Sequence, residues 1–86
     1  MPTISAFYGI LIRMYFNDHA PPHFHALYGE FQATISIQHL DVLEGELPAR
    51  ALTLVKEWAA AHRLELMENW ELCRLHAAPA KIDPLA

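Results

Sequence analysis

The sequence predicts one α+β domain in which an antiparallel four-stranded β-meander, residues ~3–38, is covered on one face by helices formed within residues ~48–77. Three observations support this prediction. Residues 3–38 are rich in aromatic and β-branched residues and are interrupted by short turn segments. Residues 49–78 contain neither glycine nor proline. Eighty-six residues supply only one hydrophobic core, so residues 1–86 are expected to form a single domain.

The first two strands are expected to form a hairpin. Residues 3–7 and 10–16 have strand composition, and Tyr8 and Gly9 between them suit a tight turn. Side chains alternate between the two faces of a strand. One face of the second strand is therefore expected to carry Ile10, Ile12, Met14 and Phe16, and the other face Leu11, Arg13 and Tyr15.

Two further strands are expected after a stiff loop at residues 17–22, in which Pro21 and Pro22 each remove a backbone donor. The third strand is residues 23–27, and a turn at Tyr28 and Gly29 leads into residues 31–37. This last run alternates cleanly, which predicts a half-buried strand with its apolar residues in the core: Phe31, Ala33, Ile35 and Ile37.

The second half is expected to be helical. Residues 41–47 look like an acidic connector, and Pro48 suits the first position of a helix. An unbroken helix over residues 48–77 would overhang so small a domain, so the sequence predicts two helices, or one kinked helix, with a turn near His62 and Arg63. Residues 79–86 are a proline-punctuated tail that is expected to be extended or mobile.

Charge and cysteine content exclude several classes of function. A net charge of −4 argues against non-specific binding of duplex DNA, although RNA bound at a focused site remains open. Cys73 is the only cysteine, so no intrachain disulfide is expected, and a buried, inert thiol is the favoured reading. No apolar stretch reaches membrane-spanning length, and we expect a cytoplasmic protein with no membrane partner.

Histidine is the unusual residue, with six copies, as many as all lysines and arginines together. If Phe24 and Ala26 point into the core, alternation places His23 and His25 on the opposite face of the sheet. That face would also carry Arg13 and Tyr15. The remaining histidines look incidental, at the end of a strand, near the helical turn and in the last helical turn: His39, His62 and His76.

Three interpretations of this cluster stay open. In the first, His19, His23 and His25 bind a divalent transition metal, Zn or Ni, with Asp18 as a fourth ligand or an orienting partner. In the second, His23 and His25 are catalytic in metal-free acid–base chemistry on a phosphodiester, with Arg13 holding the phosphate and Tyr15 or Tyr28 stacking on an RNA base. In the third, these side chains only solvate an exposed sheet face.

The residues also resemble a known family. The motif D-H-x-P-P-H-x-H stands intact in the segment from Asp18 to His25, and the flanking segments 7–10, 57–60 and 68–71 fit the same pattern. In these features the chain is similar to the small bacterial proteins grouped as domain of unknown function 4160. The resemblance implies a partner of the domain of unknown function 2442 type, encoded by an adjacent gene, and it supplies no catalytic residues.

Two functions are therefore expected from the sequence. The leading one is an interaction or regulatory component of a toxin–antitoxin-like gene pair, with the histidine-rich sheet face as its functional surface. The alternative is a histidine-dependent ribonuclease or a metal-assisted hydrolase that uses His19, His23 and His25. A homodimer formed through a free sheet edge is a further expectation.

Overall fold

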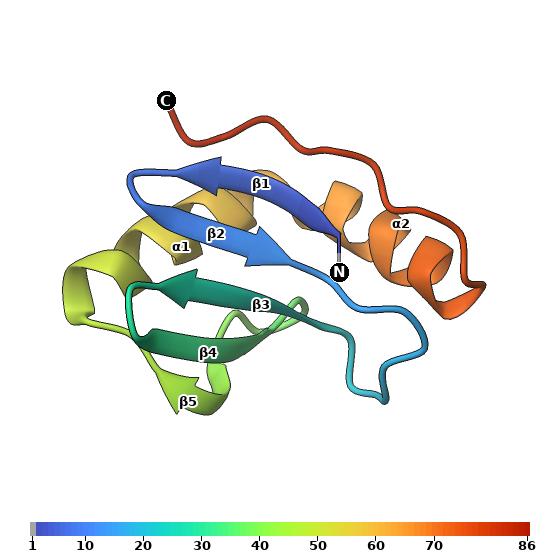
Figure 1. The fold of residues 1–86 in the computed structure, drawn as a ribbon, viewed down its shortest axis with the longest axis horizontal. Coiled ribbons are helices and arrows are strands. Elements are labelled where there is room, and N and C mark those ends of the chain that lie inside the picture. The colour runs from blue at the N-terminus through green and yellow to red at the C-terminus, as the bar shows by residue number, and fades with distance from the viewer. Residues whose placement is uncertain (1) are drawn as a thin grey trace.

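The computed structural model describes residues 2–86 and consists of a five-stranded antiparallel sheet and two C-terminal helices. The strands follow one another in space in the order β1-β2-β3-β4-β5, so the sheet is a meander (Figure 1). The elements are β1 (Thr3–Phe7), β2 (Ile10–Arg13), β3 (His23–Tyr28), β4 (Phe31–Ser36), β5 (Val42–Glu46), α1 (Ala49–Ala61) and α2 (Arg63–Arg74). The predicted α+β meander with C-terminal helices is confirmed.

The prediction of four strands is wrong, because the acidic segment read as a connector contains β5. This strand pairs with β4, with Gln32 opposite Glu46 and Thr34 opposite Glu44, and the register shifts at Thr34 and Ile35. Gly45 makes the pairing possible, since it has a φ of 75° and a Cβ there would collide with the backbone of Gln32. Four of the five side chains of β5 are exposed, so the segment lacks the apolar alternation by which strands are recognised.

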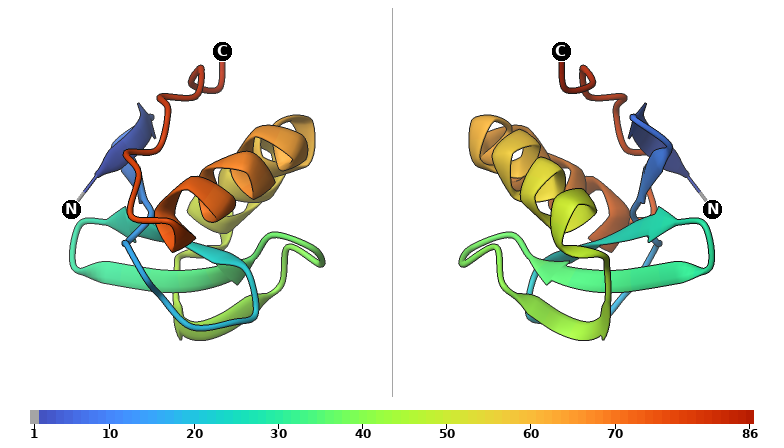
Figure 2. Two further views of the ribbon diagram at one scale, coloured as in Figure 1. Left: turned by 90° about the vertical axis from the view of Figure 1, so that its right-hand side faces the viewer. Right: turned by 90° about the vertical axis from the view of Figure 1, so that its left-hand side faces the viewer.

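The helices lie together on one face of the sheet, and the opposite face is left uncovered (Figure 2). They meet at His62, which ends α1 and precedes α2, so the predicted turn near His62 and Arg63 is confirmed. Neither helix is long and apolar enough to cross a membrane.

The core lies between the helices and the covered face of the sheet. The side chains of Ile12, Phe24, Ile35, Val55 and Trp58 are fully buried there. Burying an apolar side chain of this size stabilises the fold by roughly 1.5–3 kcal/mol. The predicted placement of Phe24 and Ala26 in the core is confirmed.

Phe31, expected in the core, is exposed, and so is Phe16, expected on the same face of its strand as Ile12. Phe16 lies beyond the end of β2 at Arg13, so the alternation of the strand does not extend to it, and its ring stacks on His76. Phe31 is the first residue of β4 after the turn, and its side chain is 41% exposed. Alternation thus predicts burial only within the paired part of a strand.

The tail, residues 79–86, is extended and is fastened along the outer edge of β1 (Figure 1). We call it the C-terminal strap. The backbone N–H of Ile82 donates to the carbonyl of Ile4 at 2.8 Å, and the indole Nε1 of Trp58 donates to the carbonyl of Asp83 at 2.8 Å. The buried side chain of Asn69 donates to and accepts from the backbone of Ala80, each at 2.8 Å. The strap therefore connects both helices to the first strand.

Candidate functional site

The loop between β2 and β3 positions Asp18 over the start of β3. The backbone N–H of Asn17 donates to the carbonyl of Cys73 at 3.2 Å, which ties the loop to the end of α2. One carboxylate oxygen of Asp18, Oδ1, accepts the backbone N–H of His19 at 3.1 Å. The other oxygen, Oδ2, is left facing β3.

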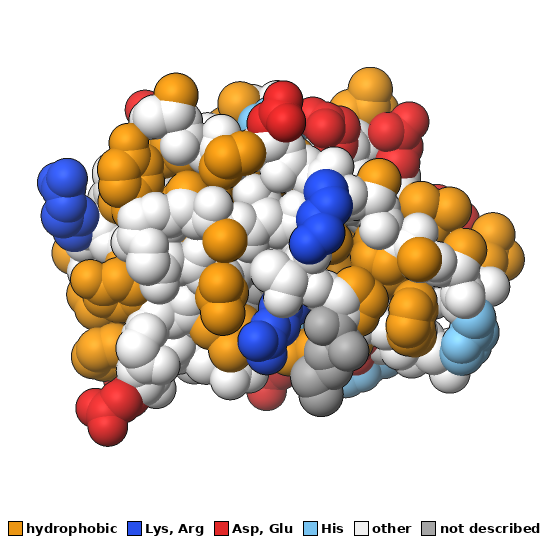
Figure 3. Space-filling view, turned by 45° about the horizontal axis from the view of Figure 1, so that its top comes forward, with side chains coloured by type: hydrophobic (Ala, Val, Ile, Leu, Met, Phe, Trp, Pro, Cys, Tyr) orange, Lys and Arg blue, Asp and Glu red, His pale blue; other side chains and the backbone are white. Residues whose placement is uncertain are grey.

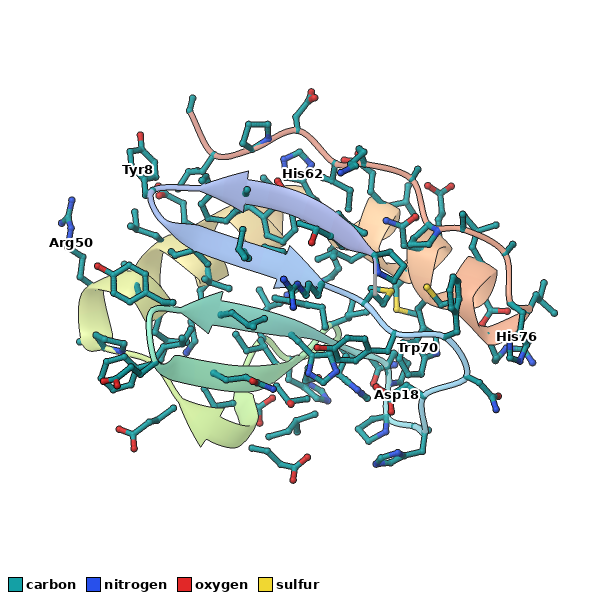
Figure 4. All side chains as sticks on the ribbon, viewed as in Figure 1. Tyr8, Asp18, Arg50, His62, Trp70 and His76 are labelled. Carbon is teal, nitrogen blue, oxygen red and sulfur yellow. The ribbon has the colours of Figure 1, made fainter. Side chains whose placement is uncertain are left out.

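Three potential metal ligands converge at this point, beside the residue labelled Asp18 in Figure 4. Oδ2 of Asp18 lies 2.8 Å from Nε2 of His23 and 3.3 Å from Nε2 of His25. One ligand atom from each of the three residues lies within 4.8 Å of the other two. His23 and His25 are two residues apart on β3, so their side chains leave the same face of the strand.

The other nitrogen of each imidazole also has a partner. Nδ1 of His23 donates to the carbonyl of Pro21 at 2.8 Å, and Nδ1 of His25 accepts from the hydroxyl of Thr34 at 3.4 Å. The ring of Tyr15 lies 4.3 Å from that of His25, measured between centroids. These contacts fix the direction of both rings, which is how metal-binding histidines are held in proteins.

Nδ1 of His23 donates to a carbonyl oxygen, and Nε2 on the other side of the ring faces the carboxylate oxygen Oδ2 of Asp18. A metal ion would bind at Nε2 and leave the hydrogen bond from Nδ1 to Pro21 in place. The geometry of the free chain is therefore compatible with that of a metal-bound one.

The pKa values of two members shift toward the forms that bind metal. Burial would raise the pKa of the Asp18 carboxyl, but hydrogen bonds from His23 and His25 and the charge of His23 together lower it. Burial lowers the pKa of His25, and its contacts with Asp18 offset this only in part. An ionised carboxylate and a neutral imidazole are the states that coordinate a metal.

The structure brings together only part of the predicted ligand set. His19 is 87% exposed at its side chain, and its Nδ1 lies 3.3 Å from Oδ1 of Asp18, so it stands outside the group. His23 lies on the predicted face, but it is buried rather than solvent-exposed, because the loop covers it and Trp70 packs 5.1 Å from its ring. The group consists of Asp18, His23 and His25.

A row of polar side chains crosses the open face through this site. The register places Arg13 opposite His25, His25 opposite Thr34, and Thr34 opposite Glu44. A depression of about 280 Å³ lies beside His25 and is lined by His25, Gln32, Thr34, Glu44 and Gly45. Glu44 was not predicted as a candidate, because its acidic segment has the composition of a connector. The signal in the sequence was Gly45 beside it, since a glycine within a strand permits another backbone to approach closely.

The other candidates lie elsewhere. Nδ1 of His62 is 2.6 Å from a carboxylate oxygen of Glu65 on the surface of α2, and His76 stacks on Phe16. Cys73 is buried, and burial raises the pKa of its thiol. None of these side chains reaches the group formed by Asp18, His23 and His25.

Comparison with known proteins gives one match. A family model described as "Domain of unknown function (DUF4160)" matches residues 9–71, a span that includes the loop, β3 and all three members of the group. No curated protein and no solved structure shows a significant match.

Proposed function

The chain belongs to the family defined by domain of unknown function 4160, and we propose that it is a metal-assisted hydrolase whose centre is formed by Asp18, His23 and His25. The convergence of Oδ2 of Asp18 with Nε2 of both histidines supports the proposal. Two imidazoles and one carboxylate suit Zn²⁺ or Ni²⁺ and leave a coordination position open. When bound, such an ion supplies Lewis-acid chemistry at that open position.

The protein's own residues divide the remaining tasks. Pro21 and Thr34 hold the two imidazoles so that both Nε2 atoms face Asp18. The depression beside His25 gives a substrate access to the centre, and Glu44 on its wall offers a carboxylate that can accept a proton. Trp70 and the loop keep water away from His23.

The arrangement favours the metal over metal-free acid–base chemistry. A general base needs one nitrogen free to take a proton from the substrate. In this site Nε2 of each histidine faces the same carboxylate oxygen, and Nδ1 of each faces another protein oxygen. Both rings are thus directed to one shared point, as coordination requires.

Metal titration of the untagged chain tests the proposal. The wild-type protein should bind about one equivalent of Zn²⁺ or Ni²⁺ by elemental analysis and calorimetry, and chelation should lower its melting temperature, because a ligand bound only by the folded state stabilises it. Asp18→Asn should weaken metal binding at least about tenfold.

Asp41→Asn is the matched control, since it neutralises an exposed carboxylate outside the group. It should bind metal as the wild type does. Absence of stoichiometric binding by the wild type, or equal affinity in Asp18→Asn, would exclude the proposed centre.

A second function is favoured by the free edge of the sheet. The strap occupies the outer edge of β1, whereas no strand within residues 2–86 pairs with the outer edge of β5, where Leu43 is 40% exposed. An open strand edge is a template for another chain. We propose the small protein encoded by the adjacent gene as its occupant, as expected for a toxin–antitoxin-like pair. Failure of the two chains to co-purify at micromolar concentration would remove this proposal.

A further inference from the structure

Arg13 is a fixed positive charge on the open face and has no negative partner among residues 2–86. No other lysine or arginine occurs in residues 1–49. Its side chain is half-buried, and its Nε donates to the hydroxyl of Thr3 at 3.4 Å. The ion pairs formed within residues 2–86 do not include Arg13. Its terminal nitrogens are therefore available to an anion from outside the chain.

The register places Arg13 beside His25, a member of the proposed metal centre. Arg13 is directly opposite His25 in the pairing of β2 with β3. Residues opposite each other in an antiparallel pair share a face, with Cβ atoms about 4.5–5.5 Å apart. Arg13 and His25 are therefore neighbours on the open face, so that one ligand can contact both side chains.

The charges on either side of His25 are opposite. Arg13 lies on the β2 side, and Glu44 lies on the far side, two strands away across Thr34. An anionic group is attracted to the first position and repelled from the second. The row of polar side chains is therefore positive at its β2 end and negative at its β5 end, and an anion is expected to bind at the β2 end.

We propose that Arg13 is the anion-binding residue of this site, and that the substrate carries a phosphate or carboxylate group held between the guanidinium and the metal centre. The planar fork of arginine suits both groups because it can donate two parallel hydrogen bonds. The rest of the substrate then lies toward the depression lined by Thr34 and Glu44. This inference rests on the proposed metal centre.

Two of the other arginines already have partners within the chain. On the face shown in Figure 3, lysine and arginine side chains stand apart from one another and form no cluster. Arg74 is paired with Glu71 at 2.9 Å, and Arg63 donates to the carbonyl of Ile37 at 3.1 Å. A single focused anion site agrees with the net charge of −4 better than an extended polyanion surface does.

Anion titration of the Zn²⁺-loaded full-length chain tests the inference. Inorganic phosphate and acetate are added separately, and binding is followed by calorimetry. Wild-type protein should bind at least one of them, and Arg13→Gln should weaken that binding at least about tenfold while its Zn²⁺ affinity stays within about twofold of the wild type. Arg13→Lys keeps the charge without the fork and should fall between the two.

Arg50→Gln is the control, because it removes the next arginine along the chain, which lies on α1 at the opposite end of the molecule from Asp18 (Figure 4). It should bind both anions as the wild type does. Preference for phosphate identifies phosphate esters as substrates, and preference for acetate identifies carboxylates. The inference is overturned if the wild type and Arg13→Gln bind anions equally, or if the Zn²⁺-loaded wild type binds neither anion. If the wild type does not bind Zn²⁺ at all, the proposed metal centre itself is overturned.

Discussion

On the face of the sheet that α1 and α2 cover, most side chains are apolar and buried, whereas on the open face the same strands carry titratable groups. Leu11 and Ile12 are neighbours on β2, yet Leu11 is 37% exposed and Ile12 is not exposed at all. On β3, Phe24 points into the core between His23 and His25. The groups on the open face are ordered by the loop at residues 17–22, which is itself tied to the end of α2. Stability and chemistry are thus assigned to opposite faces of one sheet.

The largest expected difference between the faces is in folding stability. Ile12→Ala removes a fully buried side chain and should lower the free energy of unfolding by about 2–5 kcal/mol. Leu11→Ala, one residue away on the open face, should lower it by less than about 1 kcal/mol. Urea denaturation of the two variants checks this. Similar losses in both would show that the open face is covered in solution.

A smaller difference is expected in the pH dependence of stability. Burial lowers the pKa of His25 in the folded chain, so the unfolded chain takes up a proton first as the pH falls below about 6.5. The free energy of unfolding should therefore be greatest above that pH and decrease as the pH falls. The lowered pKa of Asp18 adds a second loss below about pH 3.8.

His25→Gln should flatten the first part of this profile. Urea denaturation of metal-free protein between about pH 7.5 and pH 5.5, about one unit either side of the ordinary pKa of histidine, measures the change. Gln32→Asn lies on the same face and changes no titratable group, so its profile should follow that of the wild type. An unchanged slope in His25→Gln would mean that other groups set the pH dependence.

The covered face could be predicted from the sequence, since it depends on periodicity. The alternation around Phe24 and the run without glycine or proline after Pro48 were sufficient to place the core and both helices. β5 could not be found in this way, because it exists through its pairing with β4 and a glycine that permits close approach. Its acidic composition favours a loop when read locally.

The sequence predicted which face of the sheet carries the site, but not which side chains come together to form it. Alternation along β3 placed His23 and His25 together, and the motif brought Asp18 into consideration. Which of Asp18 and His19 turns toward β3 depends on the path of the loop, which is fixed in part by the contact of Asn17 with the end of α2. A contact between residues so far apart in sequence leaves no local pattern to read.

The C-terminal strap delays the closure of the first strand during synthesis of the chain. Ile82 closes the outer edge of β1, and 82 − 4 = 78 residues separate it from its partner Ile4. Synthesis at about 5–20 residues per second leaves that edge open for several seconds after β1 has been made. The strap is also bonded to Trp58 and Asn69, so its full set of contacts forms only when both helices are in place. Complete closure of the first strand therefore requires the strap and both helices together.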